Sequence, residues 1–201
     1  MMLKFIIVLI VNYLIGGIPT GYLFVKKIKN KDIRTQGSGN VGGTNAIRIL
    51  GFKRGIWVII LDMLKGSAAV LIAMVFLKKD SYLLYLIASY MAVIGHTFTP
   101  FLRFKGGKGV ATSAGIYFVL APMASLFALL SFGLVFGLLR VVSMATIVAV
   151  VVLDAVLIVK KANISLIIIT LLVSALIIYL HKANIKRIIK GEELGFKKKG
   201  Q

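Results

Sequence analysis

The chain has 201 residues, of which 59% are hydrophobic, and it carries a formal net charge of +19. This apolar fraction exceeds the roughly 45–50% of soluble globular domains and predicts an all-α, polytopic membrane protein. The longest polar stretch, residues 26–54, is too short for a soluble domain, so we expect one membrane-embedded domain over residues 1–201. The sequence has no cysteine, which excludes thiolate chemistry, iron–sulfur clusters and disulfides.

The positive charge does not indicate nucleic-acid binding. Lysines and arginines lie between apolar segments, without interleaved aromatic residues or a nucleic-acid motif. Basic loops of this kind orient membrane spans and meet anionic lipid headgroups. We therefore expect contact with membrane lipid and no nucleic-acid partner.

The first half of the chain predicts three spans. The first is Leu3–Val25, and a signal peptide is disfavoured because no A-x-A-like cleavage site follows this long run. The loop Lys26–Arg54 is rich in glycine and basic residues, which predicts tight turns rather than a helix or strand. Gly55–Leu77 and Tyr82–Thr99 are the next spans, joined by a short turn at Lys78–Asp80.

The second half begins with an uncharged stretch, Val110–Leu139, that is too long for one untilted span. Pro122 lies near its middle, so the stretch is either one kinked helix or two short helices hinged at Ala121–Pro122. The last predicted spans are Val141–Val159 and Ile164–Leu180, followed by a tail that starts at His181.

The distribution of basic residues distinguishes the two possibilities. With seven spans, 19 lysines and arginines fall on one side of the membrane and 5 on the other, whereas with six spans the numbers are 13 and 11. Basic loops concentrate on the cytoplasmic side. We therefore expect about seven transmembrane helices, with the amino terminus outside and the carboxyl terminus in the cytoplasm.

This topology gathers polar segments on the cytoplasmic side. The most distinctive is Phe104–Ser113, hereafter the glycine–lysine segment, in which three glycines surround Lys108 just before a helical pattern begins. Bare backbone N–H groups beside an ammonium suit an anion such as phosphate. The other clusters on this side are the first loop, Arg140 with Ser143, and His181–Arg187.

The hydroxyl and amide side chains of the first loop add a second signal. Ser38, Asn40, Thr44 and Asn45 are not needed to orient a span, whereas they suit phosphate and polyol oxygens. The loop therefore predicts a site for a phosphorylated substrate.

Ionisable residues offer few catalytic groups. Asp62 and Lys65 are three apart on one helix face, so they either neutralise each other or leave Lys65 to reach a phosphate. The only histidines are His96 and His181, each suited to act as a base, to bind substrate or to cap a helix end. No metal-ligand spacing is present, so we expect no metal and no cofactor.

Several segments together resemble a known family. They are Gly37–Asn45 with Arg48, Leu61–Gly66, Gly95–His96, Phe104–Thr112, and His181–Ile185 with Arg187 and Gly191–Glu193. In order and spacing they resemble the bacterial acyl-phosphate-dependent glycerol-3-phosphate acyltransferases, over nearly the whole chain. The resemblance implies a seven-span enzyme of the bacterial inner (plasma) membrane that transfers a fatty acyl group from acyl phosphate to the 1-hydroxyl of glycerol 3-phosphate. The products are lysophosphatidic acid and phosphate, in the first acylation of phospholipid biosynthesis.

The resemblance also implies which residues form the site. As catalytic residues it implies Ser38, Arg48, Lys108, His181 and Asn184. The residues expected to bind substrate are Gly39, Asn40, Thr44, Asn45, Lys65, His96, Gly106, Gly107, Gly109, Ser143, Arg187 and Glu193, of which the three glycines of the glycine–lysine segment are assigned to acyl phosphate.

Acyl transfer from acyl phosphate is compatible with a chain that has few acidic residues and only two histidines. Acyl phosphate is a mixed anhydride whose leaving group departs as phosphate, so the demand is for alignment and oxyanion stabilisation. The base is either His181 or an oxygen of the substrate phosphate. An acyl-CoA or acyl-carrier-protein enzyme with an H-x-x-x-x-D pair is disfavoured, since Phe101 and Lys186 stand five residues after the histidines.

A non-enzymatic alternative is an organic-phosphate transporter, whose site would lie near the bilayer midplane. A purely structural, lipid-binding membrane protein is the third reading, and it would not need polar side chains in a glycine-rich loop. The sequence leaves the oligomeric state and the preferred acyl length open.

Overall fold

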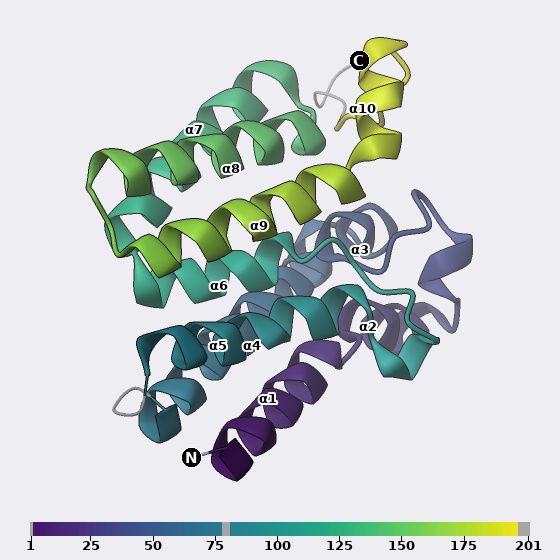
Figure 1. Ribbon diagram of the computed structural model, residues 1–201. Helices are drawn as coiled ribbons and strands as arrows, with labels where there is room; N and C mark the ends of the chain where they lie inside the picture. Colours follow the sequence, from purple (N-terminus) through teal and green to yellow (C-terminus); the bar gives the residue numbers. More distant parts are fainter. Residues whose placement is uncertain (1, 78–80, 197–201) are drawn as a thin grey trace. The chain divides into compact units, whose positions relative to one another are not determined.

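The computed structural model describes residues 2–77 and 81–196, and all regular structure within them is helical (Figure 1). The expected turn at Lys78–Asp80 lies outside the described residues. The chain divides into two compact units, residues 1–120 and 121–201.

The first unit contains six α-helices and two short 3-10 helices among the described residues. They are α1 (Met2–Gly17), α2 (Thr20–Lys29), η1 (Ile33–Thr35), α3 (Gly43–Leu50), α4 (Phe52–Leu77), α5 (Tyr82–Thr97), η2 (Pro100–Leu102) and α6 (Val110–Leu120). Helix α1 packs along α5, and α4 packs against both α5 and α6.

Glycines allow these helices to approach closely. A Cβ atom at Gly16 would overlap the carbonyl oxygen of Ala92 in α5, and one at Gly115 would overlap the carbonyl oxygen of Met63 in α4. Small residues at helix contacts are how membrane helices gain packing where lipid supplies little hydrophobic drive. Asn12 adds a polar link between three helices, since its buried amide donates to Ala69 O of α4 at 3.0 Å and Ala88 O of α5 at 2.9 Å.

A small apolar core supports the first loop. It is formed by the buried residues Val25, Ile33, Val41, Ala46, Val58 and Leu102, which come from α2, η1, α3, α4, η2 and the loop itself. The loop is therefore anchored to the helices around it. The expectation that Lys26–Arg54 contains no helix was wrong, because α3 lies within it and α4 already begins at Phe52.

The second unit has four helices within its described residues. They are α7 (Pro122–Leu139), α8 (Val142–Val159), α9 (Ile164–Leu180) and α10 (Lys182–Ile189). Helix α7 packs along α8, and α8 contacts α9 (Figure 1). The expected hinge is present, since α6 ends at Leu120 and α7 starts at Pro122, as a proline disfavours helical backbone in the preceding residue.

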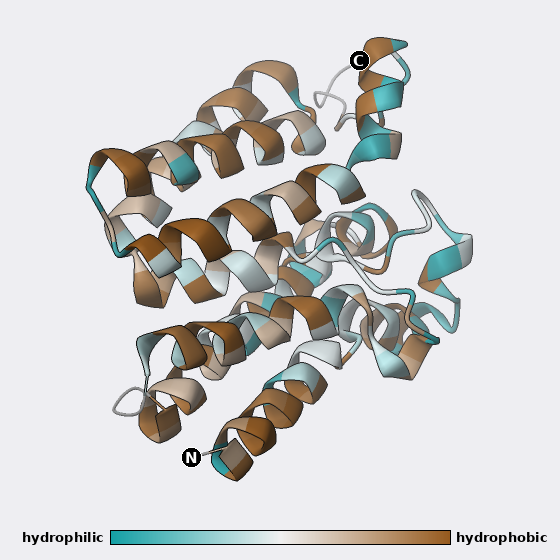
Figure 2. Ribbon diagram, in the orientation of Figure 1, coloured by the Kyte–Doolittle hydropathy of each residue, from teal (hydrophilic) through white to brown (hydrophobic). Residues whose placement is uncertain are grey.

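The composition of the helices is that of a multi-pass membrane protein. Among the described residues, five helical segments are long and apolar enough to cross a membrane, or six if α9 and α10, which meet at a bend of 55°, count as one span. Val110–Leu120 is a shorter apolar helix. Figure 2 shows apolar residues along these helices and hydrophilic residues in α10 and the segments around α2 and α3.

Candidate active site

The first loop is folded around the side chain of Asn45. Its Oδ1 accepts from Ser38 N at 2.9 Å, and its Nδ2 donates to the carbonyl oxygens of Asn40 at 2.9 Å, Gln36 at 3.0 Å and Ile33 at 3.3 Å. The residue is only 1% exposed. Its amide is therefore used within the protein, where it holds the loop together. The expected contact of Asn45 with substrate stays a prediction.

Backbone conformation explains the glycines beside it. Gly37 and Gly39 have φ of 57° and 72°, in the left-handed region that glycine adopts without strain. A Cβ atom at Gly37 would also overlap the Asn45 side chain. Between these two turns the side chain of Ser38 is exposed at the tip of the loop.

The remaining expected residues of this loop lie on or just before α3. Asn40 accepts from Gly42 N at 2.9 Å through Oδ1, in a local turn that leads into the helix. Thr44 and Arg48 lie four apart on α3, hence on one helix face, and both are partly exposed. The structure thus brings Ser38, Thr44 and Arg48 into one short region, although they come from a loop and a helix.

The glycine–lysine segment folds back onto the end of α5. Gly106 N donates to Thr97 O at 2.9 Å, and Gly107 N donates to His96 O at 3.0 Å. The expectation that these two glycines present bare N–H groups to a phosphate was wrong, because both N–H groups are used in this turn. Gly109, with φ of 78°, then directs the chain into α6, which begins at Val110, two residues after Lys108.

Asp62 and Lys65 form a buried ion pair in α4. Lys65 Nζ lies 2.7 Å from Asp62 Oδ1 and donates to Ile18 O at 2.7 Å and Gly16 O at 3.2 Å. Three acceptors account for the three hydrogens of an ammonium group. The ammonium group of Lys65 is therefore fully used by partners within the protein. The expected contact of Lys65 with a substrate phosphate stays a prediction.

His96 lies beside the same pair, with Nδ1 3.7 Å from Asp62 Oδ1. The ring is 8% exposed, and a Cβ atom at Gly107 would overlap its Nε2. His96 is thus packed between α4 and the glycine–lysine segment, in contact with the expected acyl-phosphate loop.

In the second unit, Glu193 joins three of the expected residues. Its Oε1 accepts from Ser143 Oγ at 2.8 Å and Asn184 Nδ2 at 2.5 Å, and its Oε2 accepts from Arg187 Nε at 2.7 Å. Burial opposes ionisation of this carboxyl, but the hydrogen bonds from Asn184, Ser143 and Arg187 outweigh it and lower the pKa of Glu193. The ionised carboxylate fixes α10 and the start of α8 to the carboxyl-terminal segment.

His181 stands at the junction of α9 and α10, and its ring orientation is set by the backbone. Nδ1 lies 2.7 Å from Ile177 O, and a carbonyl only accepts, so Nδ1 carries the hydrogen. In the neutral ring Nε2 is then the nitrogen with a lone pair, which is the form a general base needs.

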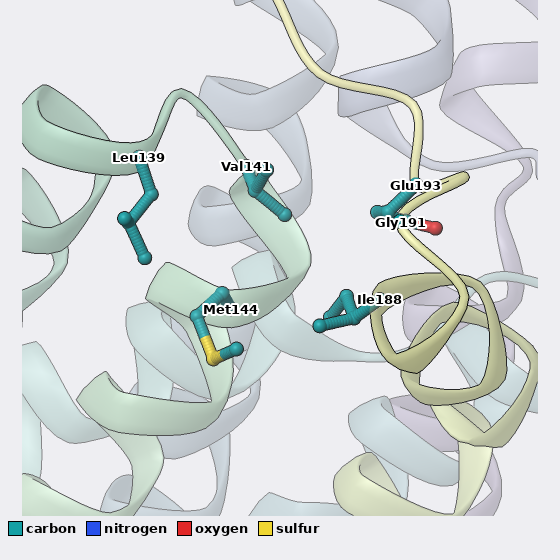
Figure 3. A pocket seen from close by; sticks show the side chains of 6 residues that line it. All are labelled: Leu139, Val141, Met144, Ile188, Gly191 and Glu193. Carbon is teal, nitrogen blue, oxygen red and sulfur yellow. The ribbon is translucent and has the colours of Figure 1, made fainter.

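A cavity of about 220 Å³ lies next to the Glu193 cluster. Figure 3 shows the residues that line it, which are Leu139, Val141, Met144, Ile188, Gly191 and Glu193. The lining is apolar apart from the Glu193 carboxylate. No group of His, Asp or Glu residues able to hold a metal ion occurs among residues 2–77 and 81–196.

Sequence reasoning missed several residues that shape these sites. Thr20 donates to Asp62 Oδ1 at 2.5 Å, and Thr99 donates to Gly17 O at 2.5 Å. The only signal for Thr20 is its position directly after Pro19, within the apolar run Leu3–Val25. Nothing in the sequence around Thr99 identifies its partner, which is 82 residues away.

These features define a multi-pass helical membrane protein with basic, glycine-containing segments between its helices. The comparison with family models identifies it further, since residues 6–191 match the family described as glycerol-3-phosphate acyltransferase. The chain belongs to this family and is an acyltransferase, which decides against the organic-phosphate transporter considered from the sequence.

Individual relatives are similar in sequence to this chain over almost its full length. A glycerol-3-phosphate acyltransferase from Chlorobium phaeobacteroides (strain BS1) is 39% identical, and one from Endomicrobium trichonymphae is 43% identical, each with 96% of both chains covered. The fold is similar to crystal structures of PlsY, an integral membrane glycerol 3-phosphate acyltransferase, at 38% identity. The glycerol 3-phosphate form gives a TM-score of 0.90 and covers 96% of both chains, and the lysophosphatidic acid form gives 0.87 and covers 96% of this chain and 95% of the other.

Proposed function

We propose that this protein transfers a fatty acyl group from acyl phosphate to the 1-hydroxyl of glycerol 3-phosphate, giving lysophosphatidic acid and phosphate. The observation that carries the proposal is the match, over 96% of the chain, to PlsY in two forms, one with glycerol 3-phosphate and one with lysophosphatidic acid. These two molecules are the acceptor before and after acylation. The reaction would supply the first acylated intermediate of phospholipid biosynthesis.

The proposed site uses cations and donors to hold phosphate groups. We assign Arg48 and Lys108 to the phosphate groups of the substrates. Both substrates carry a dianion-like phosphate, and cationic side chains form the strongest hydrogen bonds to such groups. Ser38, exposed at the loop tip, is assigned to substrate oxygens. Asn184, which Glu193 holds at 2.5 Å, is the corresponding positioned amide of the second unit.

The acyl transfer itself needs little acid catalysis. The 1-hydroxyl oxygen attacks the acyl carbonyl carbon, the carbon–oxygen bond to phosphate breaks, and phosphate leaves with the bonding electrons. The hydroxyl proton passes to His181 Nε2 or to a phosphate oxygen. Because Nδ1 donates its hydrogen to Ile177 O, the lone pair of neutral His181 is on Nε2, where it can accept that proton. No covalent acyl-enzyme is required.

We further propose that the chain is a single seven-span domain in the bacterial inner membrane, with its amino terminus outside. The proposal counts the short apolar helix α6 and α7, which are separated at Ala121, as two spans. Its support is the distribution of basic residues, most of which then lie on one side of the membrane. Acyl phosphate then approaches with its tail in the lipid and its headgroup at the cytoplasmic surface.

The reaction is tested with purified protein in detergent. We expect phosphate release from acyl phosphate only when glycerol 3-phosphate is present, and no turnover with acyl-CoA. Lys108→Ala is expected to lower the rate on the order of 10²-fold, whereas Lys160→Ala, an exposed lysine at the end of α8, serves as the matched control and keeps wild-type activity. Turnover with acyl-CoA alone would contradict the proposed donor.

A further inference from the structure

The break between α1 and α2 is capped by side chains from other parts of the chain. Three consecutive carbonyl oxygens at the end of α1 each accept from a side chain far along the sequence. Lys65 serves Gly16 and Ile18, and Thr99 serves Gly17. Carbonyl groups at a helix end have no partner in the helix, so these side chains replace the hydrogen bonds that the break removes.

Asp62 completes the junction on the other side. It accepts from the hydroxyl of Thr20, the first residue of α2, at 2.5 Å and lies 2.7 Å from Lys65 Nζ. The pair therefore places a cation at the carboxyl end of α1 and an anion at the amino end of α2, the signs that the two helix dipoles favour. Both side chains are buried, with Asp62 1% and Lys65 7% exposed.

From this junction, contacts lead to the first loop. Helix α2 contributes Val25 to the apolar core that also contains Ile33 and Val41, which flank the loop segment around Ser38. The direction in which α2 leaves the break therefore sets the position of that core and of the loop that the core supports.

Contacts also lead from Asp62 to the glycine–lysine segment. His96 Nδ1 lies 3.7 Å from Asp62, and the other side of the same ring packs against Gly107. The backbone at His96 and Thr97 then holds Gly107 and Gly106 by hydrogen bonds, one residue before Lys108. Asp62 thus stands between the two segments of the first unit to which phosphate binding has been assigned.

We propose that Asp62, together with Lys65, is a positioning residue for acyl transfer, which fixes the first loop through Thr20 and α2 and the glycine–lysine segment through His96. The inference rests on the proposed function for its kinetic consequences. The alternative is that Asp62 and Lys65 only neutralise each other's charge. In that case an uncharged pair of the same volume would support the same activity.

The decisive variant is the double substitution Asp62→Leu with Lys65→Met. Buried ion pairs replaced by apolar residues of similar volume often leave stability unchanged. Here the change also removes the partners of Gly16 O, Ile18 O and the Thr20 hydroxyl, so thermal unfolding in detergent first checks that the variant is folded. If the pair is positioning, kcat of this variant falls at least about tenfold and KM rises for both phosphorylated substrates. The reason is that the first loop and the glycine–lysine segment both lose their contacts to Asp62. Activity within twofold of wild type in the folded double variant would overturn the proposal.

A milder pair of variants keeps the test decisive if the double variant does not fold. Thr20→Val removes only the hydroxyl that links α2 to Asp62, and we expect a drop in kcat of about fivefold or more. Thr170→Val is the matched control, since that buried hydroxyl donates only to Leu166 O of its own helix. Equal, wild-type activity of the two threonine variants would overturn the proposal.

Hydrogen–deuterium exchange separates this inference from the proposed reaction. In Thr20→Val, we expect faster amide exchange in residues 33–42 and at Gly106 and Gly107, with no change in α8. Unchanged exchange in both segments would overturn the positioning role whatever the activity. A wild-type protein that releases no phosphate, but whose Thr20→Val variant shows this exchange, would reject the reaction and retain the positioning.

Discussion

Asn45 illustrates how much of a side chain's role depends on its partners in the folded chain. A polar amide in a glycine-rich loop suggests a substrate contact, and the sequence holds no information on where the amide points. In the structure its four hydrogen-bonded neighbours are Ser38 N and three carbonyl oxygens within twelve residues. The use of this side chain within the loop therefore depends on tertiary structure, and the substrate contact expected of it stays a prediction.

The hydrogen-bond partners of Asn45 predict the effect of replacing its amide by a carboxylate. Asn45→Asp keeps the acceptor for Ser38 N but turns a donor into a carboxylate oxygen facing three carbonyl oxygens. We expect a loss of stability of about 1–3 kcal/mol or more and a loss of activity, because buried acceptors are left unpaired. Thermal unfolding in detergent and phosphate release measure the two effects.

Asn163 provides the control for this substitution. It caps α9 by accepting from Ser165 N at 2.9 Å, and aspartate caps a helix as well as asparagine does. Asn163→Asp is expected to unfold within a few degrees of wild type. Equal melting temperatures for Asn45→Asp and Asn163→Asp would show that the loop does not depend on the Asn45 amide.

At the scale of helices, the sequence predicted breaks where a proline follows an apolar run of unusual length. The break before Pro122 was expected on this basis and is present. The break before Pro19 was not expected, because Leu3–Val25 has the length of one ordinary span, and its capping by Lys65 and Thr99 depends on residues far along the chain. Helix α3 was missed because glycine and asparagine outweighed its short apolar pattern.

Glycines give a test of helix packing. Gly115→Ala would place a methyl group against the backbone of Met63 and push α6 away from α4, whereas Gly133 in α7 has nothing within 4 Å of the added atom. We expect Gly115→Ala to cost about 1–3 kcal/mol, the usual effect of overpacking. Gly133→Ala should be neutral or slightly stabilising, since alanine favours a helix more than glycine does. Thermal unfolding in detergent compares them, and equal melting temperatures would contradict the close contact of α4 with α6.

At the scale of the whole molecule, composition alone was enough to predict a polytopic, all-helical membrane protein, and the family was identified from short segments in the right order. The contacts between residues far apart in the sequence could not be predicted in the same way. Polar contacts such as Thr20 with Asp62 and Ser143 with Glu193 join residues 42 and 50 positions apart, and no local pattern encodes such pairs. The seven-span orientation remains a prediction that rests on the placement of basic residues.

The absence of cysteine from the sequence makes this orientation simple to test. Single cysteines at the exposed positions Lys31, Lys190 and Lys160 can be labelled with a reagent that does not cross membranes. We expect Lys31→Cys and Lys190→Cys to react only in inside-out vesicles and Lys160→Cys to react in intact cells. Labelling of Lys31→Cys and Lys190→Cys from opposite sides would contradict the proposed topology.

The amide of Asn12 bears on how the protein is assembled during synthesis. Both carbonyl groups that accept its hydrogens, at Ala69 and Ala88, belong to helices made after α1 has left the ribosome. Until those helices enter the bilayer, the amide lacks these two acceptors in a medium where an unpaired polar group is costly. Docking of the first helix is therefore completed only after α4 and α5 have been inserted, and a nascent chain truncated before residue 88 lacks one of the two acceptors that hold it.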